Sequence, residues 1–194
     1  MRQDCSENFS LLDVGGQVKY LKTQTSFRSQ DDHQARIAPY TETEVNSDIL
    51  SLVYLSGHLS RFRIDPFLPV GSFERLYRTW IANTLERAPR ATIVASYAEG
   101  RAVGMITAEW DQDTCSIGLL AVNPSYQGLG IGTQLLKHVE RLSADKNIFS
   151  LEVKTQLSNT GAQTLYLKNA FSEVHRTFLY HAHLLPCQRS KSHN

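Results

Sequence analysis

Apolar residues recur every three or four positions in four segments of the chain, which is the spacing of an amphipathic helix. The clearest of these segments, 73–85, follows Ser72, a side chain suited to an N-cap, and is ended by Pro89. The four predicted helices span 44–55, 73–85, 130–145 and 159–170.

Other segments alternate between apolar and polar residues, as half-buried strands do. Three consecutive ones are separated only by short turns and predict an antiparallel meander. A helix joins the third to the fourth, and a strand–helix–strand unit makes its two strands parallel. We therefore expect an α/β fold with a mixed, mostly antiparallel sheet flanked by helices. The predicted strands span 91–97, 102–110, 115–122, 151–156 and 177–184.

Polar stretches divide the chain into three parts. Residues 22–34 contain almost no aliphatic side chain, which indicates a linker or mobile loop. We expect an N-terminal extension at 1–34, one domain at 35–186 and a flexible tail at 187–194. Residues 7–12 weakly resemble 169–174, and each of these two stretches precedes a strand-like segment.

The charge balance argues against several classes of function. Twenty Lys and Arg residues stand against 19 Asp and Glu, and this net charge of +1 offers no basic field to nucleic acid or to an anionic membrane. No apolar run is long enough for a membrane span, and the first residues contain no secretory signal. Cys5, Cys115 and Cys187 lie far apart without a CxxC motif, which argues against a disulfide framework. We expect a soluble, cytoplasmic protein.

The most informative segment, 122–133, connects a predicted strand to a predicted helix. Its glycines at 128, 130 and 132 let the backbone approach a ligand closely, and the following helix start offers unpaired amides and a positive dipole end. Such a backbone site suits a phosphate or pyrophosphate. The dinucleotide pattern GxGxxG fails because Thr133 stands at the position of its third glycine. The P-loop pattern fails because no Lys follows these glycines until Lys137.

The pattern Gln127-x-x-Gly130-x-Gly132 resembles the acetyl-CoA signature of the GCN5-related N-acetyltransferases (GNAT), and the resemblance covers about 37–184. It implies acetyl-CoA as co-substrate, no metal, and a fourth and a fifth strand that splay apart. Pantetheine would then bind to the backbone of Leu120, Ala121 and Val122. The pyrophosphate would meet the amides of Gly128, Leu129, Gly130, Ile131, Gly132 and Thr133.

Two side chains further along match positions of that family. Asn159 would contact the cofactor arm, although Asn is also an ordinary helix cap. Tyr166 would protonate the departing thiolate, because a phenol with a pKa near 10 is protonated at neutral pH. Its alternative role is that of a core tyrosine on the inner face of its helix.

Four short stretches of the sequence indicate a narrower resemblance within this family. The stretches 60–63, 80–83, 117–121 and 159–160 resemble bacterial dTDP-fucosamine N-acetyltransferases, a group within the same family. This implies a nucleotide-linked amino sugar as acceptor, and a truncated N-terminal lobe whose last strands remain at about 7–22. A homodimer is a further expectation.

For this acceptor, Arg61 and Arg63 are candidate ligands of a sugar-nucleotide diphosphate, since Arg binds phosphate in a bidentate fashion. Ordinary solvated arginines are the alternative. His58 and Asp65 are weaker candidates for shaping the sugar site.

Some questions stay open. The segment 115–122 contains no acid, so we name no general base. His181 and His183 share one strand face, but no third metal ligand is apparent at a recognisable spacing, so surface or sheet-edge histidines are favoured.

The alternative functions are acetylation of another small amine or a peptide N-terminus, and a non-catalytic acetyl-CoA-binding module.

Overall fold

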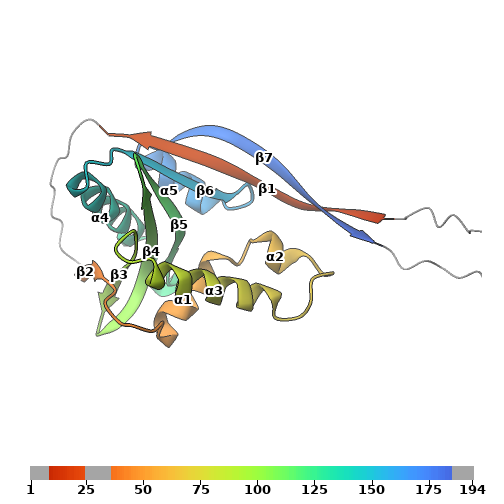
Figure 1. The fold of residues 1–194 in the computed structure, drawn as a ribbon, viewed down its shortest axis with the longest axis horizontal. Coiled ribbons are helices and arrows are strands. Elements are labelled where there is room, and N and C mark those ends of the chain that lie inside the picture. The colour runs from red at the N-terminus through yellow and green to blue at the C-terminus, as the bar shows by residue number, and fades with distance from the viewer. Residues whose placement is uncertain (1–8, 25–35, 185–194) are drawn as a thin grey trace, which may run out of the picture.

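The computed structural model describes residues 9–24 and 36–184 (Figure 1). The remaining residues, among them Cys5, Cys187 and the predicted tail at 187–194, lie outside the described part. The helices are α1 (Ser47–Ser56), α2 (Arg61–Ile64), α3 (Ser72–Glu86), the short 3-10 helix η1 (Pro124–Tyr126), α4 (Ile131–Asp145) and α5 (Thr160–Lys168). The strands are β1 (Phe9–Thr23), β2 (Arg36–Pro39), β3 (Ala91–Ala98), β4 (Arg101–Asp111), β5 (Thr114–Val122), β6 (Ser150–Gln156) and β7 (Ser172–Leu184).

All four predicted helices and all five predicted strands are present. Most of their ends shift by at most three residues, but β7 begins at Ser172, five residues before the predicted start. The N-cap prediction at Ser72 is wrong. Ser72 is the first helical residue of α3, and Gly71, at φ 79°, is its N-cap. Arg61 and Arg63 lie in the short helix α2, for which the sequence analysis predicted no element.

The strands form one seven-stranded sheet in the order β2-β3-β4-β5-β6-β1-β7. The parallel pairing of β5 with β6 is confirmed, and each of the other pairings is antiparallel. The strand β1, which falls in the segment we expected to be an extension, lies inside the sheet between β6 and β7. The first described strand thus completes a sheet that is otherwise built from later residues.

A β-bulge in β5 opens the sheet at its centre. Ala108 pairs with Ile117 and Ile106 pairs with Leu120, so β5 carries one residue more than β4 over this stretch. The residues on either side of the bulge therefore change faces: Ile117 packs into one core and Leu119 into the other. The pairing of β5 with β6 ends at Ile117, where the bulge begins, and beyond this point the two strands are not paired.

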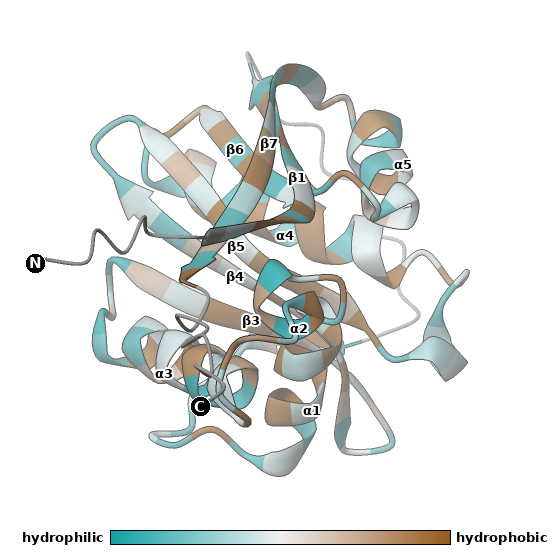
Figure 2. Cartoon of the chain, turned by 90° about the vertical axis from the view of Figure 1, so that its right-hand side faces the viewer, coloured by the Kyte–Doolittle hydropathy of each residue, from teal (hydrophilic) through white to brown (hydrophobic). Residues whose placement is uncertain are grey.

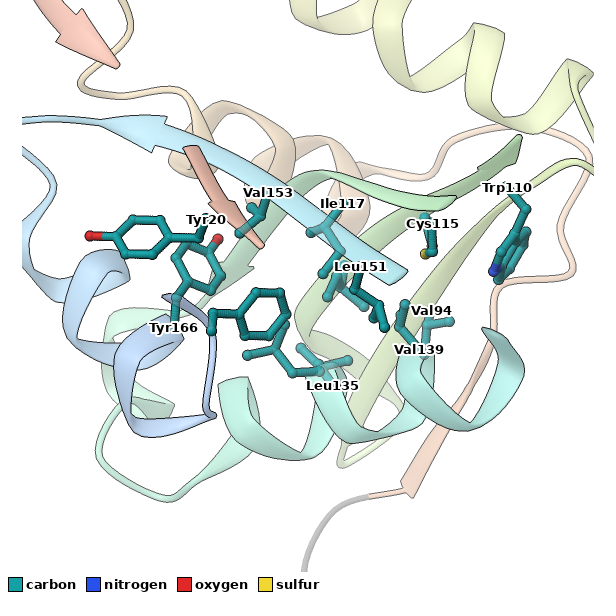
Figure 3. Packing of buried hydrophobic residues seen from close by; sticks show 14 of the residues in the cluster. Tyr20, Val94, Trp110, Cys115, Ile117, Leu135, Val139, Leu151, Val153 and Tyr166 are labelled. Atoms are coloured by element: carbon teal, nitrogen blue, oxygen red, sulfur yellow. The ribbon is translucent and has the colours of Figure 1, made fainter. Parts of the chain in front are cut away.

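Each face of the sheet is covered by helices and has its own apolar core. On one face α4 and α5 contribute Leu135, Leu136 and Tyr166 to a cluster that Figure 3 shows from close by. On the other face α1 and α3 contribute Ile49 and Ile81 to a second cluster. Because the sheet lies between two cores, β3 and β4 are almost continuously buried.

The outer strands form an arm. β1 pairs with β7 from Phe9 to Leu21 but with β6 only from Gln17 onward, so the first half of β1 and the end of β7 extend beyond the sheet (Figure 1). Figure 2, in which this arm points toward the viewer, shows α2 beside its end. Within the described ranges no helix is long and apolar enough to cross a membrane.

Candidate active site

A groove of about 670 Å³, here called the glycine-loop groove, runs along the start of α4. The end of β5, the loop after it and the first turn of α5 form its walls. Of the residues expected to bind cofactor, it is lined by Leu120, Ala121, Val122, Gly128, Gly130, Ile131, Gly132, Thr133 and Asn159. Leu129 is the exception, because its side chain is exposed on the loop.

The loop conformation presents backbone amides to this groove. Gly128 and Gly130 both have φ 78°, in the left-handed region that residues with a Cβ rarely adopt. Gly130 is also the N-cap of α4, without a side-chain cap. The amides of the first turn of α4 lack intrahelical acceptors and lie at the positive end of the helix dipole. The loop can therefore hold an anion with its backbone.

Two side chains hold the loop in place. The Gln127 side-chain amide donates to the carbonyl of Val122 over 2.9 Å, and the Asn123 side chain accepts from the amide of Ser125 over 3.0 Å. Gln127, the first residue of the motif, therefore stabilises the loop conformation through its side-chain hydrogen bond.

A second cavity of about 380 Å³, here called the inner pocket, lies between the splayed strands and α2, α3 and β1. It shares Ser56, Leu120, Asn159 and Ala162 with the glycine-loop groove, so the two spaces meet at the open edge of β5. Beyond the bulge, β5 is paired with β4 but not with β6, and this open side of β5 lies along the junction. The site is thus a channel that leads from the glycine loop to a partly open inner pocket.

Tyr166 lies at the inner pocket, and it is buried. Its ring packs against Tyr20 and Phe171, each at a centroid distance of 5.7 Å, and Figure 3 shows it beside Tyr20. Burial raises the pKa of the Tyr166 phenol well above its usual value near 10, and Tyr20 adds to the shift. Tyr166 is therefore both a core residue and a protonated phenol at the pocket, so the two roles considered from the sequence are compatible.

Asn159 lies where the groove and the pocket meet. Its side-chain oxygen accepts from the amide of Ala162 over 3.1 Å, which makes it the N-cap of α5. The structural role is thus present, and contact with a cofactor stays a prediction.

The two arginines of α2 have different surroundings. Arg61 lines the inner pocket, with its guanidinium 4.5 Å from the centre of the Phe62 ring. Arg63 lies outside both spaces, forms an ion pair with Glu74 at 3.1 Å and stacks over Phe73. Arg63 is therefore not in position to share a ligand of the pocket with Arg61.

The other two residues considered for the sugar site also differ. His58 lines the glycine-loop groove, with Nδ1 2.8 Å from the carbonyl oxygen of Leu55. Asp65 does not line the inner pocket, and its buried carboxylate contacts His181 and His183.

A carboxylate that the sequence analysis missed lies in the inner pocket. Glu152 is the one acidic residue among the lining residues of this pocket. It accepts from the Ser116 hydroxyl over 3.1 Å and pairs with Lys19 at 2.6 Å. The hydrogen bond from Lys19 holds the pKa of the Glu152 carboxyl below its usual range, although burial opposes this. Alternation along β6 places Glu152 on the face of the strand opposite to the buried Leu151 and Val153, and this alternation is the sequence signal that could have identified it.

Trp80 closes the inner pocket on the side of α3. A Cβ at Gly118 would lie 3.3 Å from the Trp80 ring and 2.9 Å from the Thr107 hydroxyl. The same hydroxyl accepts from the amide of Leu119 over 2.8 Å and so satisfies a donor at the bulge. The lack of a side chain at Gly118 thus lets the indole pack directly on β5.

In this structure two parallel strands separate at a bulge, and a glycine loop and the start of a helix lie at their open end. Comparisons with known proteins find this fold in a known family. The model of the acetyltransferase (GNAT) family matches residues 58–171, more than half of the chain, and the chain belongs to this family. The resemblance drawn from the Gln127–Gly132 motif is confirmed.

A curated relative is the spore coat polysaccharide biosynthesis protein SpsD of Bacillus subtilis (strain 168). It is 27% identical over 122 residues, which cover 63% of this chain and 42% of that protein. This chain therefore spans less than half of the length of that relative.

Two solved structures share the fold. The PaiA N-acetyltransferase of Thermoplasma acidophilum in complex with coenzyme A has a TM-score of 0.60 at 15% identity, covering 79% of this chain and 100% of that one. A GNAT family acetyltransferase of Elizabethkingia anophelis with acetyl-CoA bound has a TM-score of 0.54 at 22% identity, covering 78% and 98%.

Proposed function

We propose that this chain is an acetyl-CoA-dependent N-acetyltransferase and that its acceptor is the amine of a nucleotide-linked amino sugar. The observation that carries the proposal is the channel itself. It joins an amide-lined anion cradle, an open strand edge and a pocket that holds a protonated phenol and a carboxylate.

Each part of this channel suits one part of the co-substrate. The amides of 128–133 suit the diphosphate of coenzyme A. The free edge of β5 suits the pantetheine, whose amide groups can add to it as a further strand would. Related folds with bound coenzyme A or acetyl-CoA support this assignment.

The proposed chemistry is direct transfer. The acceptor amine attacks the thioester carbonyl, and backbone donors on β5 stabilise the oxyanion that forms. The C–S bond then breaks, and the phenol of Tyr166 gives its proton to the leaving thiolate. The ionised Glu152 attracts the ammonium form of the acceptor into the pocket, and the nitrogen loses one proton to water before it attacks. The proton that leaves the nitrogen after the C–N bond has formed restores the Tyr166 phenol. Binding both reactants in the orientation needed for reaction accounts for much of the rate acceleration.

The acceptor class rests on charge and on the relative. Arg61 and Lys154 line the inner pocket and suit the diphosphate of a nucleotide sugar, which Arg can bind in a bidentate fashion. A spore coat polysaccharide biosynthesis protein among the relatives points in the same direction.

The test is a free-thiol release assay with acetyl-CoA. dTDP-4-amino-4,6-dideoxygalactose is the acceptor, and the same nucleotide sugar with a hydroxyl in place of the amine is the control. We expect thiol release with the amine only. Release with spermidine or a peptide N-terminus alone would overturn the choice of acceptor. Binding of acetyl-CoA without turnover on any amine would overturn the catalytic assignment.

A further inference from the structure

Three potential metal ligands meet where the β1–β7 arm approaches α2. Asp65 follows α2 directly, and its side chain is fully buried. His181 and His183 occupy alternate positions of β7, so both rings lie on one face of the strand. One Asp65 oxygen, Oδ2, contacts Nδ1 of His181 and lies 2.9 Å from Nε2 of His183.

These three groups lie close enough together for small side-chain movements to place them around one ion. One ligand atom from each residue lies within 4.8 Å of the other two. Two imidazoles and a carboxylate are typical ligands of Zn²⁺ and related divalent ions, with metal–ligand distances of about 2.0–2.2 Å. Three protein ligands leave a fourth position for water. The two rings are about one-fifth exposed, so an ion can reach them from one side.

The surroundings fix these ligands. The second Asp65 oxygen, Oδ1, accepts from the amide of Phe67 over 2.9 Å, which orients the carboxylate and leaves Oδ2 for the histidines. The Phe67 ring lies 4.8 Å from that of His183, and the Phe62 ring lies 6.3 Å from that of His181. These ring contacts orient the imidazoles.

The charge of the cluster also favours a cation. A buried carboxylate is stabilised by a positive charge next to it. A divalent ion supplies that charge. On binding, each ring uses a nitrogen lone pair, and its proton lies on the other ring nitrogen.

We propose that Asp65, His181 and His183 bind one divalent transition-metal ion, with Zn²⁺ the best match to the donor set. The ion fastens the β1–β7 arm to the segment after α2. Leu179, two residues before His181, lines the inner pocket, as do Arg61 and Phe62. The metal therefore holds a wall of the pocket in place, at a distance from the reacting atoms.

Metal binding is measured directly on the full-length chain, without an activity assay. After treatment with EDTA, the protein is titrated with Zn²⁺ in competition with a chromophoric chelator, and with Co²⁺ for its visible absorption bands. We expect one ion per chain and a Co²⁺ spectrum typical of four-coordinate N/O ligation.

Two variants and a control complete the test. His183→Ala and the near-isosteric Asp65→Asn should each weaken Zn²⁺ binding by at least about 100-fold, because loss of a ligand exceeds the 10–100-fold cost of losing an outer hydrogen-bond partner. His175→Ala, on the exposed part of β7, should leave the affinity unchanged. Coenzyme A binding by the same variants reports that they are folded.

Absence of Co²⁺ bands in the wild type, or equal Zn²⁺ affinity in all three variants, would overturn the proposal. The predicted effect of the metal on the inner pocket rests on the proposed function, and it is measured separately by steady-state kinetics. Removal of Zn²⁺ should raise KM for the acceptor and leave KM for acetyl-CoA unchanged. An inactive chain that still binds Zn²⁺ at this cluster would refute the proposed function alone.

Discussion

Gly130 and Gly71 form a matched pair of positions that separates ligand binding from backbone strain. Each is the N-cap of a helix, and their φ angles are 78° and 79°. A Cβ at Gly130 meets no atom within 4 Å, and one at Gly71 lies 3.6 Å from the end of the Arg75 side chain. Valine at either position therefore incurs mainly the cost of left-handed backbone, about 1–3 kcal/mol.

Both variants should consequently lose similar thermal stability. For a chain of this length, each kcal/mol lowers Tm by about 2–4 °C. Only Gly130 lines the glycine-loop groove, where a valine side chain would stand over the amides. Amide–anion interactions at a helix start contribute about 0.3–1 kcal/mol each, and up to about 2 kcal/mol when partly buried. Loss of three of them, about 3 kcal/mol, weakens Kd by about 100-fold.

The assay is isothermal titration calorimetry with coenzyme A, beside thermal melts of the same preparations. We expect Gly130→Val to bind about 100-fold more weakly than the wild type and Gly71→Val to bind normally, with similar melting temperatures for the two variants. If Gly130→Val retains the wild-type Kd, or if Gly71→Val loses as much affinity, the assignment of the anion cradle is refuted.

Three further predictions concern single side chains. Tyr166→Phe keeps the ring packing and removes the phenolic proton, so kcat should fall by about 100-fold with KM for acetyl-CoA unchanged, and an unchanged kcat in steady-state assays would remove Tyr166 from the mechanism. Arg61→Ala should raise KM for a nucleotide-sugar acceptor about 10-fold, whereas Arg63→Ala should not; equal effects would contradict the placement of Arg61 alone in the pocket. Burial raises the pKa of the Cys115 thiol from 9.0 to about 11, so the unfolded state loses this proton first and stability falls as pH rises from 9 to 11, by about 2–3 kcal/mol. Cys115→Ala should remove that part of the pH dependence in urea titrations, and an equal decline in both proteins would show that Cys115 does not cause it.

Local signals in the sequence were sufficient for most of the fold. The apolar periodicity of α3 and α4, the apolar runs of β3 and β4 and the alternation of β6 depend only on near neighbours along the chain, and each element lies where its pattern placed it. The glycine loop was identifiable because its spacing excluded two other phosphate-binding patterns, and the groove at this loop agrees with that interpretation.

The features that sequence reasoning missed depend on contacts between distant segments. The bulge in β5 leaves the alternation of buried and exposed residues from 114 to 122 intact, and only the pairing with β4 shows that the buried side chains change faces. β1 enters the sheet far from its neighbours in the sequence. Asp65 and His181 are 116 positions apart, so no spacing rule along the chain brings them together.

The central claim is that the thioester carrier binds between β5 and β6 with its diphosphate on the glycine loop. A crystal structure of the protein grown with acetyl-CoA tests this most directly. We expect the pantetheine to lie along Leu120–Val122 and the diphosphate to be held by the amides of residues 128–133. Density for acetyl-CoA at any other place, with the glycine loop free of ligand, would contradict it.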